Sequence, residues 1–198
     1  MKSLNLKILI LFIILITSFN SKVFANSMDF ISELTSNASN ILASNQSKSE
    51  KMNQLIGLAE INVDIDGIGM YTLGKYRKSL SEDQIKEYEI LFRKYFLKSF
   101  SSRLSEYTDP KINVLSEEVI NKKYTIVSSV LEADDKRPEI KIDWRVYTIN
   151  PEKLLVRDLI IEGLSLARTQ REEFNSVIQN GDGKIEVLFF NLREFISK

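Results

Sequence analysis

Apolar side chains recur at helical spacing through the first part of the chain. Between residues 29 and 44 they lie three or four positions apart, which predicts an amphipathic helix. Ser47 and Glu50 have the pattern of a capping box, so we expect a second helix to begin there. The same pattern at Ser81 and Gln84 precedes the longest apolar stripe, and it predicts a helix from about residue 82 to 107 that ends before Pro110.

The spacing of apolar residues changes to every second position after Pro110. Residues 111–116, 124–130, 140–146 and 154–162 alternate in this way. Alternation places apolar side chains on one face of a strand, and the turns between these segments are short and polar. The pattern therefore predicts an antiparallel sheet with one covered face. Helical spacing returns at residues 166–180 and 184–196, on either side of a Gly-Asp-Gly turn.

The order of these elements is typical of the α+β class. We expect a single domain in which N- and C-terminal helices pack on a four-stranded, mainly antiparallel sheet. No repeat and no long linker divides the chain after residue 26.

The first 25 residues have the three parts of a secretory signal peptide. Lys2 and Lys7 precede an unbroken apolar run from residue 8 to 16, and Val23 and Ala25 stand at the −3 and −1 positions of a cleavage site. The alternative is a retained membrane anchor, but a span needs about 20 apolar residues, roughly twice this run. We therefore expect residues 1–25 to be removed, so that the folded domain is 26–198.

Composition excludes several classes of function. Without Lys2, Lys7 and Lys22, 24 basic residues face 27 acidic ones, and a net charge of about −3 argues against a nucleic-acid partner. The chain has no Cys and no His, so it lacks the commonest general base and the commonest zinc ligand. We expect no metal, no cofactor and no disulfide.

Two local motifs resemble functional sites, and each lacks an essential part. Asp64 and Asp66 begin a calcium-loop pattern, but Leu73 stands where the bidentate Glu should be, so we expect these residues to cap a short helix. Residues 163–167 resemble a nucleophile elbow around Ser165, but that motif needs a His partner. We expect Ser165 to cap the following helix, and we find no catalytic constellation.

The aromatic stripe of the long helix has two interpretations. Phe92, Phe96 and Phe100 share one face of that helix, and Trp144 lies on the apolar face of the sheet. Such faces usually form a filled core. The alternative is that helix and sheet stand apart around an apolar ligand, and the pattern alone does not separate the two.

Several segments together resemble one known family. They lie in the same order as in that family and span nearly all of the domain: Val63–Asp66, Tyr71–Arg77, Glu106–Leu115, Ile142–Tyr147, Val156–Leu166 and Arg171–Phe174. On these residues the chain resembles the MlaC or toluene-tolerance family, the periplasmic phospholipid-binding proteins of the Mla lipid-asymmetry system.

The resemblance implies a fold and a function. It implies an apolar pocket between helices and sheet, and a monomeric periplasmic carrier of phospholipid that meets an outer-membrane lipoprotein–porin complex and an inner-membrane ABC transporter with a lipid-binding ring. Arg171 is then expected to pair with Asp143 or Glu162 and so hold the last helices on the sheet. Our candidates for the pocket lining are Phe92, Phe96, Phe100, Trp144, Val146 and Ile161.

A second function from a different class stays open. The same fold with a filled core would be a periplasmic scaffold or partner-binding domain that carries no lipid. An enzyme is the third class, and its chemistry would depend on carboxylates, Lys or Tyr.

Overall fold

A computed structural model of the chain describes residues 26–135 and 137–198. The predicted signal peptide, residues 1–25, lies outside the described residues. Within the described residues, five elements precede the sheet: α2 (Ser27–Ala43), α3 (Lys48–Asn62), α4 (Ile65–Thr72), the 3₁₀ turn η1 (Tyr76–Lys78) and α5 (Glu82–Leu104). The strands are β1 (Ile112–Asn121), β2 (Tyr124–Leu131), β3 (Ile140–Tyr147), β4 (Leu155–Ile161) and β5 (Leu164–Ser165), and helices α6 (Leu166–Asn180) and α7 (Ile185–Ser197) follow.

Helices α3, α4 and α5 begin where their local sequence predicts, whereas α2 begins two residues before the predicted residue 29. Ser47 and Glu50 form a reciprocal capping box at α3, and Ser81 and Gln84 form another at α5. Asp64 accepts a hydrogen bond from the backbone of Gly67 at 2.9 Å and so caps α4, as expected from the incomplete calcium motif.

The sheet is an antiparallel meander in the order β1-β2-β3-β4-β5. The expected α+β class is confirmed, but the sheet has five strands rather than four. The sequence analysis missed β5, which pairs with β4 through a two-residue turn. Glu162 and Gly163 have φ values of 49° and 81° there, the left-handed conformations that such a turn requires and that Gly adopts without strain.

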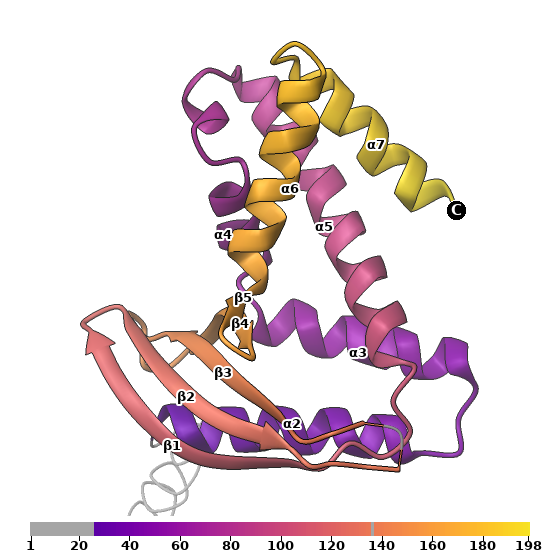
Figure 1. The fold of residues 1–198 in the computed structure, drawn as a ribbon, viewed down its shortest axis with the longest axis vertical. Coiled ribbons are helices and arrows are strands. Elements are labelled where there is room, and N and C mark those ends of the chain that lie inside the picture. Colours follow the sequence, from indigo (N-terminus) through magenta and orange to yellow (C-terminus); the bar gives the residue numbers. More distant parts are fainter. Residues whose placement is uncertain (1–25, 136) are drawn as a thin grey trace, which may run out of the picture.

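Most of the buried apolar residues belong to one of two clusters, while Leu42, Leu55 and Ala59 of α2 and α3 are buried outside both. Figure 1 shows α4, α5, α6 and α7 gathered at one end of the molecule and α2 against the sheet at the other, with α3 between them. The helical cluster is built on Tyr88, which is fully buried among aromatic rings of α5, α6 and α7. The sheet cluster joins Phe30, Ile31 and Leu34 of α2 to β2, β3 and β4.

One short junction fastens the helical cluster to the sheet. Val63 packs against both clusters, and the next amide, that of Asp64, donates to the carbonyl of Val156 in β4 at 2.9 Å. The Asp64 carboxylate also forms an ion pair with Arg157. A Cβ atom at Gly67 would lie only 2.6 Å from the Arg157 guanidinium, so glycine is what permits this close approach.

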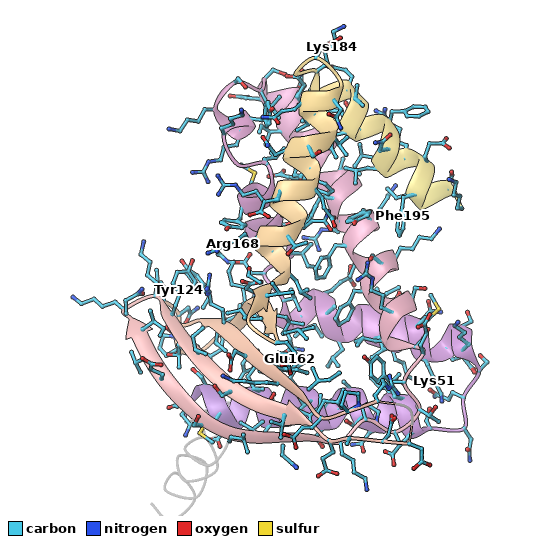
Figure 2. All side chains as sticks on the ribbon, in the orientation of Figure 1. Lys51, Tyr124, Glu162, Arg168, Lys184 and Phe195 are labelled. Atoms are coloured by element: carbon cyan, nitrogen blue, oxygen red, sulfur yellow. The ribbon has the colours of Figure 1, made fainter. Side chains whose placement is uncertain are left out.

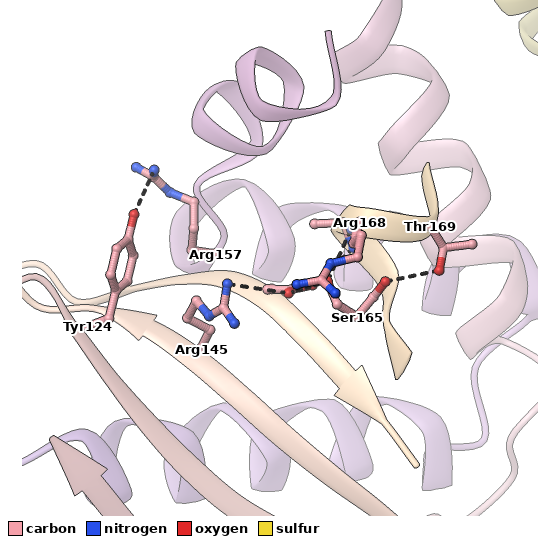
Figure 3. Close-up of polar contacts among 8 residues, drawn as sticks. Tyr124, Arg145, Arg157, Ser165, Arg168 and Thr169 are labelled. Carbon is pink, nitrogen blue, oxygen red and sulfur yellow. Dashed lines mark hydrogen bonds and ion pairs between the residues drawn. The ribbon is translucent and has the colours of Figure 1, made fainter. Parts of the chain in front are cut away.

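A buried carboxylate fastens α6 to the same strand. Asp158 is 4% exposed, and it accepts hydrogen bonds from the Ser165 hydroxyl at 2.6 Å and from the Ala167 amide at 3.0 Å. Ser165 in turn caps α6 by accepting from the Arg168 amide (Figure 3). Arg145 approaches the same carboxylate at 3.9 Å. The first turn of α6 is therefore fixed by side chains of the sheet.

Replacing this carboxylate should weaken the fold. Asp158→Ala leaves the buried Ala167 amide without an acceptor, so we expect a loss of about 3 kcal/mol in the free energy of unfolding in urea. Glu152→Ala, an exposed carboxylate in the β3–β4 turn, is the control and should be neutral. Equal unfolding midpoints for the two variants would contradict the role given to Asp158.

The buried tyrosine should make stability depend on alkaline pH. Burial raises the pKa of Tyr88 well above its usual value of about 10, although the hydrogen bond to Thr72 opposes the shift. The contribution of the Tyr88 proton to the free energy of unfolding is complete below about pH 10. It is lost as the pH rises further, because the tyrosine then ionises in the unfolded chain but stays protonated in the fold. In urea titrations between about pH 8 and 11, Tyr88→Phe should lose less stability than the parent chain. An equal loss of stability in the variant and the parent chain would show that Tyr88 does not cause the pH dependence.

Candidate functional site

Two of the six predicted lining residues are buried core residues: Phe92 lies in the helical cluster and Val146 in the sheet cluster. Phe92 is 2% exposed in the helical cluster, where its ring meets those of Tyr88 and Phe174. Val146 is fully buried in the sheet cluster against α2. The structure therefore does not bring these two side chains together.

The next two turns of α5 differ from the turn that holds Phe92. Phe96 packs at the border of the helical cluster, and its ring stacks on that of Phe100 with centroids 5.8 Å apart and planes inclined by 9°. Both side chains are only half-buried, although α5 packs against α3 along this part of the molecule. This half of α5 thus presents an incompletely covered aromatic surface.

Trp144 occupies a comparable position on the sheet. It lies at the border of the sheet cluster, is half-buried, and its Nε1–H donates to the Ser129 hydroxyl at 2.9 Å. Ser129 donates onward to the carbonyl of Ile142, so the indole orientation is fixed by two hydrogen bonds. The indole N–H of Trp144 thus has its hydrogen-bond acceptor within the sheet, and the ring remains available for apolar contact.

An apolar row crosses the inner face of the sheet beside Trp144. The strand pairing aligns Ile142 with Ile161 and Ile161 with Leu164. Exposure rises along this row: Ile142 is 9% exposed, Ile161 is half-buried, and Leu164 is 69% exposed. Figure 2 labels Glu162, which lies in the turn between the last two members. The row leads from the covered interior to solvent at the β4–β5 end of the sheet.

Leu164 extends this apolar row, and the sequence analysis did not name it as a candidate. Its segment had been interpreted only as a turn and a helix cap, because a two-residue strand has no measurable alternation. The one available signal was the tight turn at Glu162 and Gly163, which makes residue 164 the cross-strand neighbour of Ile161.

Two clefts among the described residues lie away from the six predicted lining residues. One, of about 420 Å³, is open on the outer face of the sheet and includes Tyr124, Ile126 and Arg145 in its wall. The other, of about 290 Å³, lies between α6 and the turn that joins α4 to η1, and includes Lys75 and Arg171. Neither has any of the six predicted lining residues in its wall, so their lining role stays a prediction.

The ionisable groups near these surfaces have structural partners. Burial raises the pKa of Tyr95, and its hydroxyl donates to the side chain of Gln170 at 2.8 Å. Within the part of the chain that the structure describes, no three His, Cys, Asp or Glu side chains are grouped as metal ligands would be. Nor is any helix in that part long and apolar enough to cross a membrane.

The expected ion pair of Arg171 was wrong. Asp143 pairs with Lys141 at 3.3 Å, and Glu162 accepts from the backbone of Lys141. Arg171 instead lies over the ring of Tyr71 at 5.2 Å and against the backbone of Gly74. The rotation of α6, fixed by Asp158, points Arg171 toward α4 rather than toward the sheet.

A protein-family model described as MlaC protein matches residues 26–194. Seven chains of solved structures also match. One is the phospholipid-binding protein from Ralstonia solanacearum, solved in complex with a phospholipid; it superposes with a TM-score of 0.73 at 15% identity, over 87% of this chain and 98% of that one. No curated protein sequence matches.

Stability should separate core residues from lining candidates on the same helix. Phe92→Ala removes a fully buried ring, so we expect the free energy of unfolding to fall by roughly 3–5 kcal/mol. Phe100→Ala removes a half-buried ring, and in a chain refolded without lipid we expect a loss of roughly 1 kcal/mol. Chemical denaturation measures both, and a Phe100 variant as unstable as the Phe92 variant would place Phe100 in the core.

Proposed function

The chain belongs to the MlaC family, and from this premise we propose that it is a periplasmic phospholipid carrier. It would receive and deliver lipid at an outer-membrane lipoprotein–porin complex and at an inner-membrane ABC transporter with a lipid-binding ring. The sequence of residues 1–25, with the pattern of a signal peptide, supports the compartment. The fold shared with a protein solved in complex with a phospholipid supports the ligand.

The observation that carries the proposal is the divided interior. A domain of this size usually has one contiguous core, with smaller clusters at its margin. Here two cores remain apart, joined through Val63, and half-buried apolar side chains lie on both sides of the division. Phe96 and Phe100 belong to the helical side, and Trp144 and Ile161 to the sheet side. Acyl chains laid between these surfaces would complete an otherwise interrupted interior.

The energetics of lipid exchange favour a carrier of this kind. A phospholipid buries about 30 CH₂ groups, each contributing about 0.8 kcal/mol when it leaves water. The same contribution is present in a bilayer, so the pocket needs only to match the membrane and exchange is nearly thermoneutral. The direction of transport is then set by the partners and by ATP hydrolysis at the transporter.

The alternative, a scaffold with a filled core, predicts a different surface. A scaffold gains nothing from half-exposed aromatic rings beside its cores, and side chains of the right size would fill the division at no functional cost. The family and the polar groups described above likewise favour binding over an enzymatic reaction, because the buried carboxylate of Asp158 is already engaged by Ser165 and Ala167.

Mass spectrometry of the purified mature chain tests the proposal. We expect phospholipid to copurify at about one equivalent, and we expect Phe96→Asp to lower that yield severalfold because a carboxylate beside acyl chains is costly to desolvate. Phe190→Asp is the matched control: this Phe is 60% exposed on α7 and should retain the lipid.

Two results would count against the carrier. A lipid-free mature chain that also takes no lipid from liposomes would favour the scaffold. An unchanged yield from Phe96→Asp in a folded protein would remove Phe96 from the lining but leave the carrier standing.

A further inference from the structure

The junction of β5 and α6 exposes apolar and basic side chains beside a fixed turn. The Ser165 hydroxyl and the Ala167 backbone amide both donate to the buried Asp158 carboxylate, which holds the junction on the sheet. Leu164 is 69% exposed, Leu166 is 43% exposed, and Arg168 is also exposed. Two exposed leucines and an exposed arginine thus lie within five consecutive residues, beside the turn that Asp158 holds.

A group of exposed cations lies next to this junction. Arg171 lies one turn after Arg168 on α6, and it shares the 290 Å³ cleft with Lys75 at the start of η1. Arg77 and Lys78 follow in η1, and all of these cations are exposed. We call the group Lys75, Arg77, Lys78, Arg168 and Arg171 the basic face.

The basic face carries an excess of positive charge. Considering the described residues, none of its five cations forms an ion pair with a carboxylate. Glu172, in the wall of the cleft, and Glu173 beside it offset part of the charge. Since the domain as a whole is acidic by about three charges, a local cationic surface concentrates the attraction for an anionic partner.

We propose that the basic face and the adjoining leucines are the surface by which the chain docks on an anionic phospholipid bilayer. Exposed leucines beside Arg and Lys match the boundary between acyl chains and phosphate groups. The inference rests on the proposed carrier function, because Leu164 is also the outer end of the apolar row that contains Ile161. Docking here places the open end of that row at the surface of the membrane in which the proposed partner complex lies.

Vesicle sedimentation of the mature chain tests the docking surface. We expect binding to vesicles of phosphatidylcholine with about 30 mol % phosphatidylglycerol, and binding at least about tenfold weaker to phosphatidylcholine alone. Raising the salt concentration should weaken the binding to anionic vesicles. Equal binding to both vesicles, or none to the anionic vesicles, would overturn the proposal; the second result with retained binding to an acidic polypeptide would assign the surface to a protein partner.

Charge reversal locates the surface. Arg77→Glu with Arg168→Glu should lower the affinity for anionic vesicles about 30-fold or more. Lys48→Glu with Lys153→Glu changes the net charge equally at exposed positions outside the basic face and is the matched control. Leu166→Ser should weaken binding with all charges intact. Equal losses from the two charge-reversed pairs would overturn the assignment.

The proposed docking surface and the proposed carrier function can be refuted independently of each other. Arg77 and Arg168 are not lining candidates, so the charge-reversed chain should still copurify with phospholipid. A parent chain that carries no lipid but still prefers anionic vesicles would refute the carrier and leave the docking surface. A chain that carries lipid but binds neutral and anionic vesicles equally would support the carrier and refute the docking surface.

Discussion

The attachment of α4 and α6 to one stretch of β4 is the constraint on which the rest of the molecule depends. Val156 accepts the backbone of Asp64, Arg157 pairs with its carboxylate, and Asp158 holds the start of α6. The helical bundle is thus fastened at three successive residues of one strand. α2 covers β1 and β2 independently. Because the bundle need not pack along the whole sheet, two cores can form without merging, and the apolar row from Ile142 to Leu164 is left only partly covered.

Much of this architecture follows from local sequence signals. The capping boxes at Ser47 and Ser81 place helix starts to the residue, because they satisfy amides that no other nearby group can reach. The alternating strands are equally local, since a half-buried strand must alternate. The short strand β5 was not predicted, because two residues are too few to show an alternating pattern. The predicted partner of Arg171 was wrong, because the rotation of α6 is fixed by Asp158, a carboxylate on another element.

The candidate site shows why a stripe of aromatic residues does not by itself identify a pocket. Phe92, Phe96 and Phe100 are equivalent in periodicity, and all three lie on one face of α5. Their surroundings differ because α6 and α7 cover only the upper part of that face, where Phe174 meets Phe92. The same holds on the sheet, where Val146 lies under α2 and Trp144 lies at the border of that cover. Burial is decided by elements more than seventy positions away, which no local pattern encodes.

A carrier must also balance stability against exchange. Half-exposed apolar side chains weaken the ligand-free state, because the area that Phe100, Trp144 and Leu164 leave in water contributes nothing to folding. Under the proposed function, bound lipid covers that area and stabilises the fold by mass action. Burial of the same acyl chains in a bilayer is about equally favourable, so this stabilisation does not prevent release of the lipid. Under the same proposal, the attachment of α4 and α6 at β4 would keep the two clusters apart without lipid, so that the next lipid would meet a surface that is already formed.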